Sequence, residues 1–367
     1  MFSTRPQFVG ANDALQSAAG RLSELLARRK ALDAAALLAN PWIGAAGAGA
    51  LFLLAAAALI AVTGDPRAGA PHVRIALGQG PDHPLPVPTA PAPVTGPAAV
   101  ATPADARQAL VQAPIAGLTA PGPGGLLPIV ASDGRTPAQA YARPFHDTGA
   151  PKAALVIGGL GLNAKVTRQA IEDLPPEVTL SFVPYAEGLQ GWIDLARASG
   201  HEVLLEAPME PLDYPQNDPG PYTLMAADAP QETGKRLEML LSRATGYFGV
   251  TNYLGGRFLA SDAAMTMFSA ALRQRGLGFI DDGAAAGRGG AEPRASAERV
   301  IDQDLDGASI DQQLQALEAS AQQHGKAMAS GFAYPVTLQQ VQRWAAGLQG
   351  RGVVLAPASA LMSRRTP

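Results

Sequence analysis

The chain has 367 residues, with 28 Lys and Arg against 31 Asp and Glu, a formal net charge of −3 and no cysteine. Without cysteine it has no disulfide, iron–sulfur cluster, thiolate zinc site or cysteine nucleophile. Its near-neutral charge argues against nucleic acid or another polyanion as a partner. Its 40 glycines and 32 prolines exceed the usual share, which indicates long stretches without regular structure.

The first 64 residues predict a membrane anchor. Leucines at helical spacing among basic residues predict an amphipathic cytoplasmic segment over 1–40. The uncharged apolar run 43–62 can cross a hydrocarbon core of about 30 Å, which predicts one transmembrane helix within 41–64. A buried alanine-rich core helix is the alternative. More basic residues precede the run than follow it, so we expect a single-pass protein of the bacterial inner membrane, with a periplasmic C-terminal domain.

Residues 65–150 contain half of the prolines, several of them at alternate positions such as Pro84, Pro86 and Pro88. Closely spaced prolines favour an extended chain that builds no packed core. We therefore predict a disordered Pro/Ala-rich linker over 65–150, with a small folded domain as the alternative.

From residue 151 to 367 short apolar runs alternate with amphipathic stretches. The predicted strands lie at 154–157, 178–182, 202–205, 247–252, 277–281, 298–302, 326–331 and 352–355, and the first helices at 163–174, 188–199 and 230–245. Such alternation predicts an α/β domain with a parallel sheet. The number of units favours a distorted seven- or eight-stranded β/α barrel, with an open doubly wound sheet as the alternative.

In a β/α barrel the functional groups follow the carboxyl ends of the strands. That rule selects the glycines Gly158, Gly159 and Gly161, the acids Glu206, Glu210, Asp281 and Asp282, and the polar or aromatic residues Asn252, Tyr253, Arg257 and Tyr334. No lysine or hydroxyl follows the glycines as a phosphate-binding loop requires, so we do not expect a nucleotide site there.

Five segments resemble, in order, the motifs of the divergent polysaccharide deacetylase family, a branch of the NodB-type carbohydrate esterases. They are 156–161, 206–211, 249–258, 279–282 and 331–335, within a resemblance that spans 152–363. The resemblance implies a distorted β/α barrel and metal-dependent removal of N- or O-acetyl groups from sugars. It also implies an Asp pair after the first strand and histidines in later motifs, with one Asp as base and the others holding a divalent metal that activates water.

The chain departs from that pattern at each of these positions. Gly158 and Gly159 stand where the resemblance places the Asp pair, and Glu206, Tyr253 and Phe332 stand where it places histidines. The five histidines are His72, His83 and His146 in the predicted linker, and His201 and His324 away from the predicted site. We therefore predict that the metal site is missing and that no cofactor is bound.

Three functions remain open. The first is a catalytically degenerate, membrane-anchored protein that binds cell-envelope polysaccharide or peptidoglycan, or a protein partner. Its cleft would contain Glu210, Asn252, Tyr253, Arg257 and Tyr334. Arg257 would contact the ligand or pair internally with Asp281 or Glu206.

The second function is an active carbohydrate hydrolase or deacetylase with a carboxylate-only catalytic site of Glu206, Asp281 and Asp282. Such a site suits a hard divalent cation, or two carboxylates that flank a glycosidic bond. The third is a structural protein that makes interactions in the envelope. Convergence of the three carboxylates would favour the second function.

Overall fold

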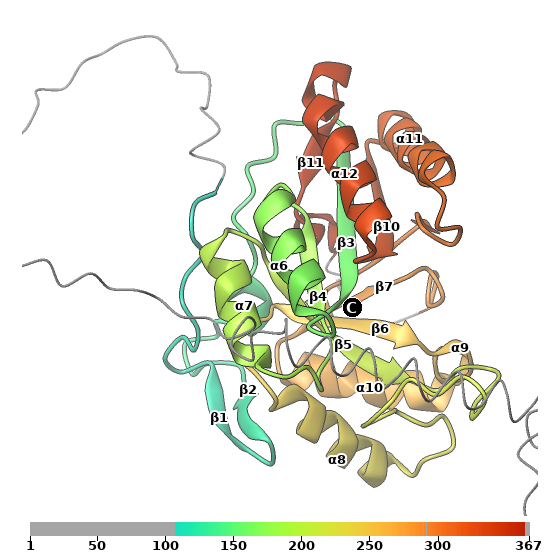
Figure 1. Cartoon of the computed structure of the whole chain (residues 1–367). Helices are drawn as coiled ribbons and strands as arrows, with labels where there is room; N and C mark the ends of the chain where they lie inside the picture. The colour runs from blue at the N-terminus through green and yellow to red at the C-terminus, as the bar shows by residue number, and fades with distance from the viewer. Residues whose placement is uncertain (1–106, 289, 291, 364–367) are drawn as a thin grey trace, which may run out of the picture. The chain divides into compact units, whose positions relative to one another are not determined.

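The computed structural model describes residues 107–288, 290 and 292–363 (Figure 1). The amphipathic segment 1–40, the apolar run 43–62 and the linker up to residue 106 are predictions that lie outside the described residues.

The described chain is built around one parallel sheet. Its strands are β3 (Lys152–Leu160), β4 (Thr179–Phe182), β5 (Val203–Met209), β6 (Gly249–Leu254), β7 (Gly278–Asp281), β8 (Arg294–Ser296), β9 (Arg299–Val300), β10 (Lys326–Phe332) and β11 (Val354–Ala356). They follow the order β8-β7-β6-β5-β4-β3-β10-β9, and β11 pairs with the start of β3. The α/β class and the parallel sheet expected from the sequence are thereby confirmed.

The two ends of this path are consecutive in the chain, because only Ala297 and Glu298 separate β8 from β9. The Ala297 N–H donates to the Asp281 carbonyl beside β7, and the Glu298 N–H donates to the Met328 carbonyl of β10. One short segment therefore borders both edges, and the sheet curls round instead of lying open. The sheet is therefore a curled, parallel half-barrel rather than the open doubly wound alternative.

Helices cover the outer face of the sheet (Figure 1). They are α6 (Ala164–Asp173), α7 (Leu189–Ala198), α8 (Pro230–Leu241), α9 (Gly256–Ala260), α10 (Asp262–Gln274), α11 (Gly307–His324) and α12 (Pro335–Leu348), with 3₁₀ turns η1 (Gln349–Arg351) and η2 (Ala358–Leu361). Local sequence fixes where several begin. Asn163, Ser261 and Asp306 each accept a backbone N–H as the N-cap of α6, α10 and α11.

Strand alternation divides the apolar residues between two clusters. Leu155 and Ile157 belong to the large cluster between sheet and helices, whereas Ala154 and Val156 belong to a smaller cluster inside the curl. Successive side chains of a strand point to opposite faces. A residue's parity in its strand therefore decides whether it faces the helices or the interior of the barrel.

Residues 107–150 correct the predicted linker. They form a hairpin of β1 (Thr119–Gly122) and β2 (Gly125–Pro128) and the short helix α5 (Pro137–Ala140). Leu118 is fully buried and Tyr141 is 2% exposed, both in the inner cluster. The buried Arg197 of α7 donates to the carbonyls of Val111 and Tyr141. The segment shows no helical or strand period in its sequence. Most of it forms no regular element, and a few buried side chains and the distant Arg197 hold it in place instead.

The localisation expected from the sequence also requires correction. Among residues 107–363, with 289 and 291 excepted, no helix combines the length and apolar character that a membrane span requires. The described residues therefore contradict the predicted location in the inner membrane with a periplasmic domain. The run 43–62, on which it rested, lies outside the part of the chain that the structure describes.

Candidate functional site

The candidate site lies at the carboxyl ends of the strands, on the inner face of the curled sheet. Gly158 of β3, Ser181 of β4 and Glu206 of β5 meet there, because the Ser181 hydroxyl donates to Glu206 Oε1 over 2.9 Å. Tyr253 follows on β6, where Pro208 of β5 is its partner in the ladder. Four neighbouring strands thus contribute one residue each.

Glu206 lies at the centre and is only 2% exposed. Its Oε1 atom accepts the Gly159 N–H at 2.6 Å as well as the Ser181 hydroxyl. Its Oε2 atom is buried and has no hydrogen-bond partner. Burial raises the pKa of this carboxyl from 4.5 to about 7, against the opposing effect of the two hydrogen bonds. Glu206 is therefore poised to titrate near neutral pH.

The two glycines of β3 make this arrangement possible. A Cβ atom on Gly158 would lie 2.8 Å from Ser181 Oγ and 2.9 Å from Glu206 Oε1, closer than real contacts allow. Gly159 has a φ of +73°, a conformation that side-chain-bearing residues rarely adopt. Glu206 thus extends into space that a residue with a side chain at 158 would occupy.

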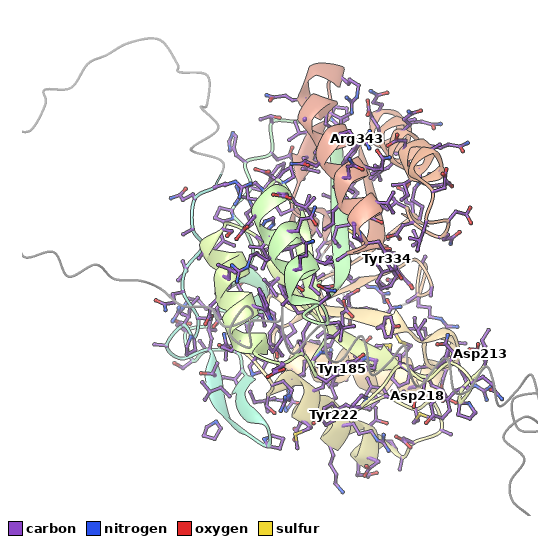
Figure 2. All side chains as sticks on the ribbon, in the orientation of Figure 1. Tyr185, Asp213, Asp218, Tyr222, Tyr334 and Arg343 are labelled. Carbon is purple, nitrogen blue, oxygen red and sulfur yellow. The ribbon has the colours of Figure 1, made fainter. Side chains whose placement is uncertain are left out.

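Aromatic rings gather around Glu206. Phe332 contacts Tyr253 edge to face, with ring centroids 6.1 Å apart, and Tyr334 with centroids 6.4 Å apart. The charge of Glu206 contributes to the raised pKa of both Tyr185 and Tyr253, for which burial is the larger cause. We call Tyr185, Tyr253, Phe332 and Tyr334 the aromatic cluster. Figure 2 labels Tyr185 and Tyr334, which follow β4 and β10 in the chain.

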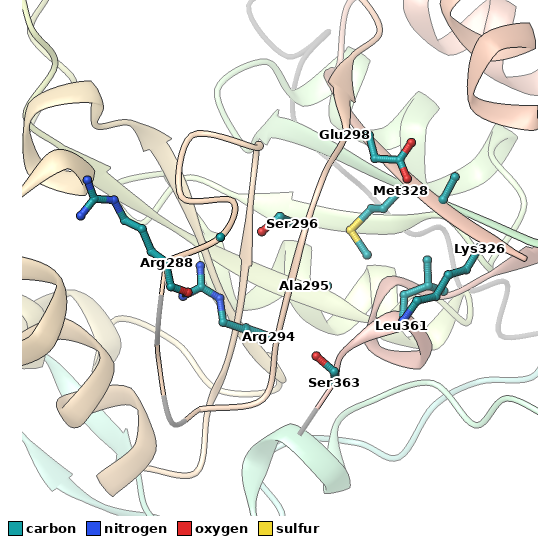
Figure 3. A pocket seen from close by; sticks show the side chains of 11 residues that line it. Arg288, Arg294, Ala295, Ser296, Glu298, Lys326, Met328, Leu361 and Ser363 are labelled. Carbon is teal, nitrogen blue, oxygen red and sulfur yellow. The ribbon is translucent and has the colours of Figure 1, made fainter. Parts of the chain in front are cut away.

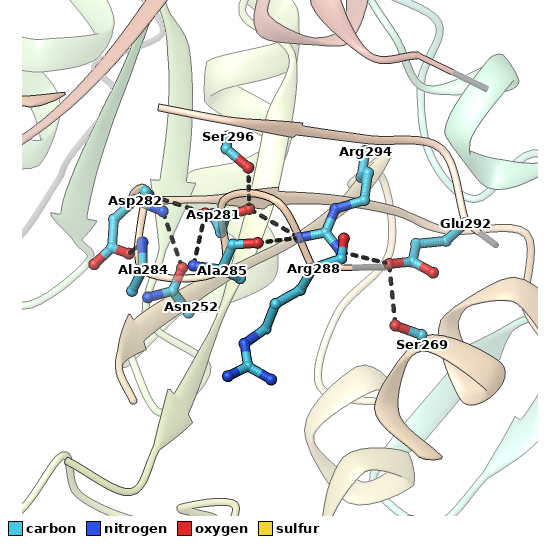
Figure 4. Close-up of polar contacts among 11 residues, drawn as sticks. Asn252, Ser269, Asp281, Asp282, Ala284, Ala285, Arg288, Glu292, Arg294 and Ser296 are labelled. Carbon is cyan, nitrogen blue, oxygen red and sulfur yellow. Dashed lines mark hydrogen bonds and ion pairs between the residues drawn. The ribbon is translucent and has the colours of Figure 1, made fainter. Parts of the chain in front are cut away.

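Asp281 does not join Glu206. It shares the outer face of β7 with Phe279, and Arg294 lies over the Phe279 ring while pairing with Asp281 Oδ2 at 3.1 Å (Figure 4). Ser296 donates to the same oxygen, and the backbone N–H groups of the following turn occupy Oδ1. The expected convergence of Glu206, Asp281 and Asp282 is therefore wrong, because adjacent strand residues face opposite sides.

Asp282 and Asn252 serve the turns in which they lie. The Asp282 N–H donates to Asn252 Oδ1 at 3.1 Å, and the Asn252 amide donates to the Leu254 carbonyl at 2.8 Å. Asp282 Oδ1 accepts the Ala284 N–H, and burial raises the pKa of this carboxyl. The Asn252 side chain, predicted to contact a glycan, is thus occupied by the backbone on both sides.

Glu210 and Arg257 pair with each other. Arg257 Nε lies 3.3 Å from Glu210 Oε1, and the Ala226 N–H donates to Glu210 Oε2. Arg257 also donates to the Leu212 carbonyl. The internal partner of Arg257 is therefore Glu210, not Asp281 or Glu206, and half of the arginine side chain stays exposed.

Sequence reasoning missed three residues that shape the site: Ser181, Tyr185 and Asp302. Ser181 lies near the carboxyl end of β4 and Tyr185 follows it, so the strand-end rule could have found them. Asp302 is buried and accepts the Phe332 N–H at 2.7 Å and the Thr337 hydroxyl at 2.9 Å. It fixes the backbone that presents Phe332, and only the tertiary structure reveals this.

The residues present do not fit the divalent metal that the family resemblance implies. Two glycines offer no ligand, and Glu206, Tyr253 and Phe332 supply one carboxylate among aromatic rings. Across the described ranges no three His, Asp or Glu side chains converge as a set of metal ligands. His201 lies before β5, with both ring nitrogens near backbone carbonyls.

A separate cavity of about 280 Å³ opens between β8 and β10 (Figure 3). Arg294 and Lys326, the first residues of those strands, line it with Arg288 and Glu298. Arg288 pairs with Asp262, as Arg294 does with Asp281. This cavity contains no predicted site residue and lies at the amino ends of its strands, away from Glu206.

The chain is similar to one described protein family and to several individual proteins. Residues 155–362 match the model of a family described as divergent polysaccharide deacetylase. A crystal structure of an uncharacterised protein from Agrobacterium tumefaciens C58 is 39% identical, with a TM-score of 0.63, and covers 65% of this chain and 99% of its own. An uncharacterised protein of Haemophilus influenzae is 27% identical over 199 residues, which are 52% of this chain and 70% of that protein.

A more distant match is the catalytic domain of a peptidoglycan N-acetylglucosamine deacetylase from Eubacterium rectale. It is 14% identical, with a TM-score of 0.40, over 60% of this chain and 95% of that domain. At that distance we draw no functional conclusion from it.

Proposed function

Because the chain belongs to the divergent polysaccharide deacetylase family, we propose that its domain binds a polysaccharide at the carboxyl ends of β3, β5, β6 and β10 without metal-dependent deacetylation. The observation that carries this proposal is that glycine and aromatic residues stand where the family resemblance places most of the metal ligands. Glycines occupy the positions of the implied Asp pair, and the single carboxylate of Glu206 lies under tyrosines and a phenylalanine. Metal-assisted hydrolysis needs ligands that this site does not provide.

The aromatic cluster supports sugar binding. Tyr and Phe rings present flat apolar faces, and tyrosine adds a hydroxyl at the edge. Tyr334 is 43% exposed and Tyr185 and Tyr253 are half-buried, whereas Glu206 is only 2% exposed. The Tyr185 hydroxyl donates to the Pro219 carbonyl. A pyranose ring stacked there would meet both kinds of group.

The carboxylate-only hydrolase has less support. Asp281 is neutralised by Arg294 on the outer face, so it is not available to a substrate at the inner face. Glu206 and Asp282 remain as separate acids, each with its pKa raised by burial. No observation favours a purely structural role in the envelope.

The proposal is tested with the full-length chain in two assays. Sedimentation with insoluble peptidoglycan, and calorimetry with N-acetylglucosamine oligomers, should detect binding. Acetate release from the same glycans should stay at the buffer level with Zn²⁺, Co²⁺, Mg²⁺ or no added metal. Binding that is absent for every glycan, or acetate release that a metal stimulates, would refute the proposal.

A further inference from the structure

Glu206 is a buried acid without a counter-charge. Within the described chain, the Gly159 N–H and the Ser181 hydroxyl donate to this carboxyl, and both reach Oε1. Oε2 has no partner, and no Lys, Arg or His contributes to the shift in its pKa. Buried ionised groups are normally paired and hydrogen-bonded on all their oxygens. In the ionised form of Glu206, a donor for Oε2 is therefore missing from the protein itself.

The side chains near Glu206 indicate which chemical class of donor would suit Oε2. Tyr185 and Tyr253 both face the charge of Glu206, and Phe332 packs against Tyr253. Aromatic faces attract a cation through their quadrupole, and the attraction grows when the cation is desolvated. A carboxylate below and aromatic rings around it form an environment for an ammonium group, which offers three N–H donors and a positive charge.

We propose that the site selects glycans that carry a free amino group, the deacetylated hexosamine, whose ammonium pairs with Glu206 Oε2 within the aromatic cluster. This inference rests on the proposed function, because it names the class of sugar bound at the same site. An N-acetylated sugar offers one neutral N–H there, and an unmodified hexose offers one hydroxyl. The amine is the group that also supplies the missing charge.

Access to Oε2 requires movement of a side chain. The atom is closed off from solvent, whereas Gly159 above it is half-buried. Tyr334 is the most exposed ring of the aromatic cluster. The proposal requires rotation of such a ring, on the timescale of side-chain motions.

The test compares two ligands by calorimetry at pH 7 and physiological salt: the β-1,4-linked tetramer of glucosamine and the same tetramer of N-acetylglucosamine. The full-length chain should bind the free-amine tetramer at least tenfold more tightly, a difference of about 1.4 kcal/mol. Glu206→Gln, which keeps an acceptor for Gly159 and Ser181, should reduce that preference to less than twofold. Glu187→Gln removes the exposed carboxylate two residues after Tyr185 and should leave the preference unchanged.

The outcomes separate the two proposals. Equal binding of the two tetramers by the wild-type chain overturns the ammonium inference and leaves polysaccharide binding in place. A preference that Glu187→Gln lowers as much as Glu206→Gln also overturns it, because general charge attraction then explains the preference. If neither tetramer nor peptidoglycan binds, both proposals fail. The wild-type comparison needs no variant, so misfolding of Glu206→Gln would not remove the test.

Discussion

The carboxylate of Glu206 occupies the space that a side chain at residue 158 would need. A Cβ atom on Gly158 would lie 2.9 Å from Glu206 Oε1, and these residues are 48 positions apart in the sequence. The glycine and the glutamate therefore depend on each other. The position that the family resemblance assigns to an acid has lost its side chain, and an acid from the second strand along the sheet extends into that volume.

Gly158→Ala should destabilise the fold by about 1–3 kcal/mol, because the new methyl group meets Glu206 Oε1 and Ser181 Oγ in a packed interior. In a Glu206→Ala background the same substitution should cost at least 1 kcal/mol less, since one of the two obstructing atoms is gone. Urea denaturation of the four chains of this cycle measures the coupling.

Gly191→Ala is the matched control for that cycle. Gly191 lies on α7 with open space where a Cβ would project, so alanine there should stabilise the fold by about 0.5–1 kcal/mol. Additive effects of Gly158→Ala and Glu206→Ala would contradict the mutual dependence.

Glu206→Gln should change how stability depends on pH. Burial raises the pKa of Glu206 from 4.5 to about 7, so between these values the folded chain keeps a proton that the unfolded chain has lost. The contribution of this carboxyl to stability is fully present below pH 4.5 and is lost as pH rises through 7. Glutamine does not titrate. The free energy of unfolding of the variant, relative to that of wild type, should therefore rise by roughly 2–3 kcal/mol between pH 5 and 8.

Denaturation of both chains at pH 5, 6, 7 and 8 measures that difference. The groups that face Glu206 are Tyr185 and Tyr253, whose raised pKa values lie above this range. A constant difference for Glu206→Gln would show that Glu206 titrates near its ordinary pKa.

Asp281→Asn should destabilise the fold by about 1–3 kcal/mol, because the buried Arg294 loses its nearer carboxylate and keeps only Glu292, 3.8 Å away. Polysaccharide binding by the folded fraction should be unchanged, since Asp281 faces away from the aromatic cluster. Asp282→Asn, whose Oδ1 accepts a single backbone N–H, should cost less than about 1 kcal/mol. Loss of binding by Asp281→Asn at unchanged stability would restore the carboxylate site as a functional one.

Tyr334→Ala should weaken polysaccharide binding roughly three- to tenfold, the range expected when one stacked aromatic ring is removed. Stability should change by less than about 1 kcal/mol, because the ring is 43% exposed. Calorimetry and thermal unfolding measure the two effects. Val111→Ala removes another exposed apolar side chain, 63% exposed, and should leave both unchanged. An unaltered affinity in Tyr334→Ala would exclude this ring from the binding surface.

The sequence alone determined most of the order of strands and helices after residue 151, but it gave no sign of β8 (Arg294–Ser296). The helices expected at 163–174 and 188–199 are α6 and α7 within about one residue at each end, because N-caps and glycines mark their limits locally. The strand-end rule also selected Glu206 and Tyr253, since the carboxyl ends of parallel strands share one edge of a sheet. Both inferences use only residues that are close to one another in the sequence.

Tertiary structure alone decided which of these residues act together. Asp281 and Asp282 are adjacent in sequence, yet only the position of β7 in the curled sheet shows which of them faces Arg294. The pairing of Arg257 with Glu210 and the burial of Tyr141 in the inner cluster likewise depend on distant segments. Burial and the missing partner of Glu206 Oε2 follow from packing in three dimensions, and local sequence carries no signal for either.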